Sequence, residues 1–291
     1  MADVIDSMLD LMRRLPPPRT EENVQTLVDI CQPDEADELL QSVDQPLQVM
    51  VDRATGREYL ACDYNRDGDS YRSPWSNEYD PPIDEGAVPS VRMRKLEIQA
   101  NEAFDTYREM YYEGGVSSVY LWDPEDPSGG SNFAGVVVLK KTMTPNALYE
   151  PSGSWDSIHV FETVERGRQA HYKLTSTVML HLVTRKGNDG EPKISPDKKM
   201  GDNWKRDGEV SLSGSMTRQT EQDWPLHDAS SHISNIGRMI EEMEIKMRNL
   251  LQEVYFGKTR DIVYDLRSVD DLEKARLQKD LQRELVGLIK K

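Results

Sequence analysis

A short run of oxygen-bearing side chains, Asp63-Tyr-Asn65-Arg-Asp67-Gly68, has the spacing that begins a calcium-binding loop. Oxygen ligands stand at positions one, three and five and glycine stands at position six, as in an EF-hand. Such a loop also needs a glutamate at position twelve, and here that position is Pro74. We therefore expect no metal site, and we interpret the run as turns in which Asn65 and Gly68 adopt left-handed backbone conformations.

Motifs for catalysis are not found in the sequence. The histidines do not form an HExxH motif or a cysteine-histidine zinc spacing, and no G-x-S-x-G, Walker loop or G-x-G-x-x-G opens a helix after a strand. We therefore expect neither an enzyme nor a bound cofactor. The five histidines are His159, His171, His181, His227 and His232.

The strongest candidate for a binding element is a basic amphipathic stretch over residues 271–291. Four leucines spaced four, four and three apart share one face of a helix. From Lys274 onward six basic residues stand against two acidic ones. Such a helix can pack on its own core, lie on a membrane, or enter a groove of an acidic partner. The stripe is Leu277, Leu281, Leu285 and Leu288, and its basic rim includes Lys274, Lys279 and Arg283.

Composition excludes several classes of protein. The chain of 291 residues has a net charge of −16, which argues against nucleic-acid binding because phosphate backbones require a basic surface. Two cysteines, Cys31 and Cys62, are too few for a disulfide scaffold and fit a reducing compartment. The longest strongly apolar run, Val136–Leu139, is far too short to span a membrane. An acidic N-terminus without an apolar region does not fit a secretory signal, so we expect an intracellular protein.

The first 45 residues predict a small helical bundle. Apolar residues follow the helical period in 4–15, 20–31 and 34–40, and prolines end the first two segments. Residues 46–90 are polar and rich in turn residues, with short strands expected near 47–51 and 59–64. Aromatic and arginine side chains gather there; they could form an interface, but we favour their anchoring the segment to its own chain.

The rest of the sequence predicts an α+β fold. A helix over 91–112 is followed by five strand-like runs without a helix between them, which favours an antiparallel meander. The runs are 116–122, 133–141, 155–163, 169–184 and 209–216. We expect loops at 123–132, 142–154 and 186–208, which contain many polar, proline and glycine residues.

A long helix over 233–256 carries a narrow apolar seam that alternates by four and three residues. This helix would be about 30 Å long, whereas five strands span only about 20–25 Å. It can therefore cross its own sheet diagonally or extend onto the sheet of a partner. The seam, which we assign to a subunit interface, is Ile236, Ile240, Met243, Met247, Leu250 and Val254.

Several stretches resemble the F-actin capping protein beta subunit, in order, over nearly the whole chain. The longest is CDYNRDGDSYRSPWSNEYDPP at 62–82, and YEGGVSSVYLW at 112–122 and AHYKLTSTVM at 170–179 are further examples. Shorter ones are LDLMRRLPP at 9–17, SVDQP at 42–46, WDSIH at 155–159 and YFGKT at 255–259.

This resemblance implies that the chain is one half of a pseudo-symmetric heterodimer, whose other half is a capping protein alpha subunit. Heterodimers of this family cap the barbed ends of actin filaments and block subunit addition and loss there. It implies a central antiparallel sheet that continues across both subunits. The expected parts are a helical stalk at 1–45, an irregular segment with short strands and a helix at 46–115, the sheet at 116–218, a long helix over the sheet at 229–257, and a C-terminal actin-binding helix, the tentacle, at 258–291.

The resemblance also leaves a second function open, namely a heterodimeric scaffold whose tail binds another acidic partner or anionic lipid. A basic cluster of Lys246, Arg248, Lys258 and Arg260 would suit phosphoinositides, actin or regulators of capping. A solvated helix end explains the same charges equally well. The implied location is the cytoplasm and the cortical actin cytoskeleton.

Overall fold

The computed structural model describes residues 4–124, 132–144, 152–185, 209–228 and 230–253. The chain divides into two units, Met1–Met243 and Glu244–Lys291. The first unit combines helices and sheets, as predicted. No helix within the described ranges is long and apolar enough to cross a membrane.

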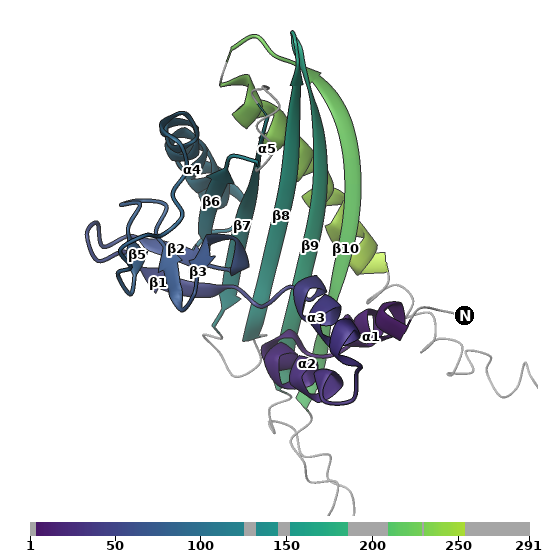
Figure 1. The fold of residues 1–291 in the computed structure, drawn as a ribbon. Coiled ribbons are helices and arrows are strands. Elements are labelled where there is room, and N and C mark those ends of the chain that lie inside the picture. Colours follow the sequence, from purple (N-terminus) through teal and green to yellow (C-terminus); the bar gives the residue numbers. More distant parts are fainter. Residues whose placement is uncertain (1–3, 125–131, 145–151, 186–208, 229, 254–291) are drawn as a thin grey trace, which may run out of the picture. The chain divides into compact units, whose positions relative to one another are not determined.

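Five long strands form the central sheet, in the spatial order β10-β9-β8-β7-β6 (Figure 1). They are β6 (Val116–Trp122), β7 (Phe133–Met143), β8 (Ser152–Arg166), β9 (Gln169–Arg185) and β10 (Glu209–Pro225). Every neighbouring pair is antiparallel, which confirms the predicted meander. Most of these strands run further than predicted, and β10 reaches Pro225 because pairing with β9 continues through its polar second half.

One face of the sheet is covered by α4 (Val91–Tyr111) and by the first half of α5 (Ser231–Leu251), up to Met243 (Figure 1). Side chains of a strand alternate between the two faces, so the odd-numbered residues of β6 and β7 point to these helices. The Tyr111 hydroxyl of α4 also donates to the carboxylate of Glu241 in α5 at 3.1 Å. The apolar side chains that meet there are Val119, Leu121, Phe133, Val137 and Phe161 of the sheet, Leu96, Ala100 and Phe104 of α4, and Ile233 and Ile236 of α5.

The opposite face is covered in part by a hairpin of β1 (Gln48–Val51) and β2 (Glu58–Ala61). Leu47, Leu60 and Cys62 from this segment are buried against the sheet. The backbone of Leu60 is also satisfied by β6, because its N–H donates to the Ser118 hydroxyl at 2.9 Å and its carbonyl accepts from the Tyr120 hydroxyl at 2.6 Å. The sheet residues of this core are Tyr120, Val136, Val138, Ile158 and Met179.

Three short helices form a bundle with its own small core near the same face, beside β9 and β10 (Figure 1). They are α1 (Val4–Met12), α2 (Thr20–Val28) and α3 (Pro33–Ser42), with a 3₁₀ turn, η1 (Pro17–Arg19), after α1. The predicted helices are thus confirmed. Their core consists of Met12, Val24, Leu27 and Leu39.

The polar segment after β2 contains structure that the sequence did not predict. A 3₁₀ turn, η2 (Asp63–Asn65), leads into a small sheet of β3 (Arg66–Asp67), β4 (Ser70–Arg72) and β5 (Tyr79–Asp80). Its aromatic residues anchor it to the chain itself, as favoured above. The ring of Tyr64 stacks on Trp122 with centroids 5.8 Å apart, and the guanidinium of Arg57 lies 3.5 Å from the ring centre of Trp75.

The turn conformations were predicted only in part. Gly68 has the expected positive φ of 59°. Asn65 does not, and among the described residues other than glycine it is Asn77 that has a positive φ, of 65°. Asn65 is instead buried, and its amide bridges three parts of the backbone at Leu60, Cys62 and Arg72. The role of Asn65 is therefore to connect backbone segments through its side chain, which does not require a left-handed backbone conformation.

A buried carboxylate joins α4, the small sheet and β6. Glu97 has no exposed surface, and its two oxygens accept a bidentate pair of hydrogen bonds from Arg72 at 2.8 and 2.9 Å. Arg94 donates to the same carboxylate at 2.5 Å, and the backbone N–H of Leu121 donates to it at 2.8 Å. Full pairing of this kind is what makes a buried charge tolerable.

We expect Glu97→Ala to lower the free energy of unfolding by about 3–5 kcal/mol, because it leaves the buried guanidinium of Arg72 without its counter-charge. Glu22→Ala is the control, since its pair with Arg19 is well exposed and should contribute less than about 1 kcal/mol. Urea unfolding of both variants measures the difference. Equal unfolding midpoints would contradict the role given to Glu97.

Candidate interaction surfaces

The predicted tail lies outside the described residues. This holds for the leucine stripe Leu277, Leu281, Leu285 and Leu288 and for its basic rim of Lys274, Lys279 and Arg283. Val254 of the seam and Lys258 and Arg260 of the basic cluster also lie outside the described residues. Their roles stay predictions.

The described part of the basic cluster contains one exposed cation and one paired cation. Lys246 is exposed. Arg248 is half-buried and lies 3.4 Å from the carboxylate of Glu244, which is 1% exposed. Because the charge of Arg248 is partly neutralised inside the helix, it is a poorer anion contact than the sequence suggested.

The apolar seam of α5 is largely buried in the single chain. Ile236, Ile240 and Met243 are at most 6% exposed, so no partner is required to cover them. Met247 is also buried, but at the next turn the buried residue is Leu251, whereas Leu250 is half-buried. Met239, which was not predicted to belong to the seam, is also buried, with 2% of its surface exposed. A subunit interface at the seam stays a prediction.

In the run that resembles a calcium loop, the Asn65 side chain forms hydrogen bonds to the backbone. The side-chain oxygen of Asn65 accepts the N–H of Cys62 at 2.8 Å, and its amide nitrogen donates to the carbonyl of Arg72 at 2.8 Å. Among the described residues, no group of three or more histidine, cysteine or acidic side chains could hold a metal ion. Burial raises the pKa of the Cys62 thiol to about 12, so this cysteine stays protonated and is a poor nucleophile.

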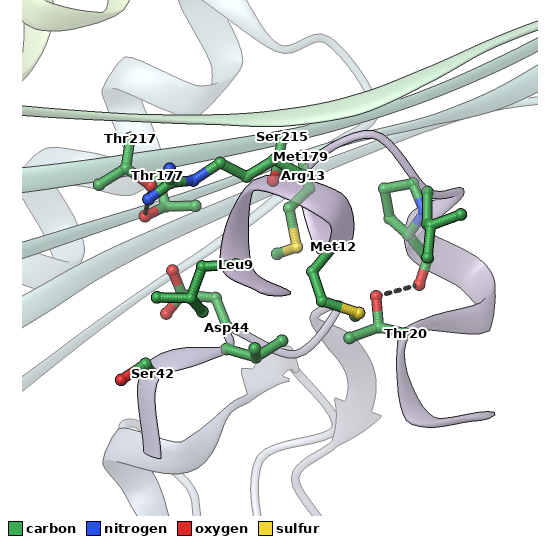
Figure 2. Close-up of a pocket in the computed structure, with 13 residues that line it drawn as sticks. Leu9, Met12, Arg13, Thr20, Ser42, Asp44, Thr177, Met179, Ser215 and Thr217 are labelled. Atoms are coloured by element: carbon green, nitrogen blue, oxygen red, sulfur yellow. Dashed lines mark hydrogen bonds between the residues drawn. The ribbon is translucent and has the colours of Figure 1, made fainter. Parts of the chain in front are cut away.

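A cavity of about 60 Å³ lies between the N-terminal helices and the middle of β9 and β10 (Figure 2). Leu9, Met12 and Arg13 of the α1 end face Thr177, Met179, Ser215 and Thr217 of the strands across it, and Asp44 closes one side. Its volume suits only a few water molecules. The cavity therefore marks where the bundle contacts the sheet and is too small for an organic ligand.

The outer edge of β6 is closed by side chains of α4. The amide of Asn101 accepts the backbone N–H of Val119 at 2.9 Å and donates to the carbonyl of the same residue at 2.8 Å, as a neighbouring strand would. Glu97 accepts the N–H of Leu121, the next outward-facing residue. An edge whose donors and acceptors are satisfied cannot accept another strand there.

The outer edge of β10 is different. The N–H of Ser215 faces outward and donates to the carbonyl of Arg13 at the end of α1, at 2.9 Å. Outward-facing backbone groups recur every second residue on an edge strand, so Thr217, Gln219, Glu221 and Asp223 face outward too. Among the described residues, the outward-facing backbone groups of these four positions have one hydrogen bond, which the Arg218 side chain donates to the carbonyl of Thr217 at 2.8 Å. Within the described part of the chain, the stretch from Thr217 to Asp223 is therefore an open strand edge.

The sequence did not identify either edge. Glu97 and Asn101 are spaced four apart beside the apolar stripe of α4, and two buried polar residues on a helix next to an edge strand are the signal that could have found the closed edge. The open edge depends on the spatial order of the strands, which the pattern of alternation does not give.

Comparison with known proteins identifies the family. The family model of the F-actin capping protein beta subunit matches residues 5–263. Proteins named F-actin-capping protein subunit beta are 55% identical in Aspergillus oryzae, over 98% of this chain and 98% of the relative, and 50% identical in Caenorhabditis elegans, over 97% and 95%. The solved homodimeric actin capping protein alpha subunit from Plasmodium berghei covers 92% of this chain and 96% of its own at 16% identity, with a TM-score of 0.46, too low to argue a shared fold. The chain belongs to the family of F-actin capping protein beta subunits.

Proposed function

We propose that this chain is the beta subunit of a heterodimer that caps the barbed ends of actin filaments and blocks subunit addition and loss there. The observation that carries the proposal is identity of 50–55% over nearly the full length of relatives from a fungus and a nematode, all named as capping subunits. A capping subunit acts by binding, and the chain is not an enzyme. Its place of action is the cytoplasm, on cortical actin structures.

The open edge of β10 is the proposed docking site for the alpha subunit. A strand from a partner adds to an exposed edge through backbone hydrogen bonds. The β6 edge cannot serve, because Asn101 and Glu97 occupy it. Pairing along Thr217–Asp223 would continue the five-stranded sheet into the partner and make this chain one half of a larger sheet.

Exposed apolar residues on the N-terminal helices extend this surface. Val4 and Leu11 of α1 are 48% and 46% exposed, and α1 ends next to Ser215 on the β10 edge. A partner strand on β10 would therefore approach the side of α1. Covering Val4 and Leu11 would add apolar burial to the backbone pairing, which is the combination that gives a stable interface. The three helices would then form one side of a stalk shared with the partner.

We expect Gln219→Pro to prevent assembly with the alpha subunit while leaving the sheet of this chain intact. The N–H of Gln219 faces outward, and proline is tolerated on an edge strand where the missing N–H faces solvent. A partner strand would lose one hydrogen bond and meet the proline ring. Size-exclusion chromatography of the co-expressed subunits measures assembly, and hydrogen exchange of β9 shows whether the sheet persists.

Gln219→Ala is the matched control, because it removes the same side chain and keeps the N–H. It should assemble like the unmodified chain. If Gln219→Pro assembles as completely as Gln219→Ala, with β9 equally protected, the partner does not pair along this edge.

The tail supplies actin affinity in this proposal. Its basic rim of Lys274, Lys279 and Arg283 would attract the acidic surface of actin, and its leucine stripe would enter an apolar groove. Lys246, Lys258 and Arg260 are further candidates for contact with actin, phosphoinositides or regulators of capping, whereas Arg248 is paired with Glu244.

We expect Leu281→Asp to weaken capping by about tenfold or more, chiefly through faster dissociation, because each buried leucine contributes about 1.5–3 kcal/mol. Replacing Lys274, Lys279 and Arg283 with alanine should instead lower the association rate and its dependence on salt. Pyrene-actin elongation from filament seeds, with the alpha subunit co-expressed, measures both. Gln282→Asp is the control, because it adds the same charge beside the stripe.

Deletion of residues 272–291 separates this role from two others. We expect assembly and melting temperature to stay nearly unchanged while capping weakens. A melting temperature lowered by several degrees would show that the tail packs on its own core. Unchanged capping would remove the tail from the mechanism, and binding of the tail to anionic vesicles without any capping would favour the scaffold.

A further inference from the structure

A buried histidine lies where the start of α5 meets the sheet. His232 is 3% exposed, and its ring and the ring of Phe133 pack edge to face with centroids 5.0 Å apart. Its Nδ1 lies 2.8 Å from the hydroxyl of Tyr172 on β9. Its Nε2 lies 3.3 Å from Oε1 of Glu165 on β8. Both ring nitrogens therefore have polar partners on strands of the sheet.

The carbonyl of Pro225 fixes the first hydrogen bond in this cluster, and the remaining directions are assigned from it. Pro225, at the end of β10, can only accept, so it is the amide nitrogen of Asn235 that faces it, at 3.2 Å. The other hydrogen of that nitrogen points to the Tyr172 oxygen, also at 3.2 Å. The Tyr172 hydrogen is then free to donate to Nδ1 of His232. In this assignment His232 is neutral, with its hydrogen on Nε2 directed to Glu165.

Protonation of His232 breaks this chain of donors. A second ring hydrogen on Nδ1 would face a Tyr172 oxygen that already accepts from Asn235, and the Tyr172 hydrogen would lose its acceptor. Glu165 attracts the imidazolium, but its Oε1 atom already accepts a hydrogen bond from the guanidinium of Arg92 on α4 at 2.7 Å. Burial lowers the pKa of His232, and the positive charge of Arg92 acts in the same direction, whereas Glu165 opposes both.

We propose that His232 is a proton-operated latch that holds the first turns of α5 on β8, β9 and the end of β10 at neutral pH and releases them when it is protonated. The latch reaches the strand whose edge we assign to the partner, through Asn235 and Pro225. The latch does not depend on actin binding, and its test measures hydrogen exchange in α5 itself.

The pH range follows from the sign of the shift. A histidine whose pKa is lower in the folded protein than its ordinary value of about 6.5 takes up its proton more readily when unfolded. The stabilisation is therefore complete above the ordinary value and is lost as pH falls through the lower, folded value. Acidification, and not alkalinisation, should open the latch.

Hydrogen exchange of the co-expressed heterodimer tests the latch. Between about pH 7.5 and about pH 5.5, exchange in residues 231–243, corrected for the intrinsic pH dependence, should accelerate by up to about tenfold per pH unit between the ordinary pKa of about 6.5 and the lower folded pKa, and then level off. His232→Asn cannot titrate and should show the same corrected exchange at both pH values. Tyr172→Phe removes the conflict at Nδ1 and should reduce the pH dependence, which keeps the test decisive if the asparagine variant folds poorly.

His171→Asn is the matched control. It lies on β9 next to Tyr172, on the opposite face of the strand, near Asp223 and Glu221. It should leave the pH dependence of α5 as in the unmodified chain. The latch is wrong if corrected exchange in 231–243 does not change with pH, or if it changes equally in His232→Asn.

Discussion

The carboxylate of Glu97 is the contact on which the rest of the fold most depends. It accepts hydrogen bonds from Arg72 of the small sheet, from Arg94 of its own helix and from the backbone N–H of Leu121 in β6. A buried carboxylate requires such complete pairing, and here each donor comes from a different part of the chain. The irregular segment, the covering helix and the edge of the main sheet are therefore held in one arrangement by a single charge.

This arrangement makes the sheet asymmetric. Asn101 and Glu97 occupy the backbone groups of Val119 and Leu121 on β6, whereas the described contact on the β10 edge is that of Ser215 with the end of α1. A five-stranded sheet with two open edges could pair with other chains on both sides and form open-ended assemblies. With one edge closed, pairing is limited to a single partner, as a heterodimer requires.

The sequence predicted the elements whose side chains repeat. The five long strands, α4, α5 and the three N-terminal helices show alternation or a helical period, and all of them form. The small sheet could not be predicted, because β3 and β5 have two residues each and are held by long-range contacts such as that of Arg72 with Glu97. Asn65 shows the same limit, since its residue type suggested a turn while its buried position made it a bridge.

The proposed docking site was less predictable than the fold because it consists largely of backbone. The seam of Ile236, Ile240 and Met243 was the visible apolar signal, yet the chain buries it on its own. An open strand edge has no signature in side-chain types, and only the spatial order of the strands locates it. Backbone pairing alone also selects weakly among partners, since every strand carries the same groups. If an alpha subunit pairs along this edge as proposed, its specificity must come from side chains near the edge, and Glu221 and Asp223 on β10 and the exposed Val4 and Leu11 of α1 are our candidates.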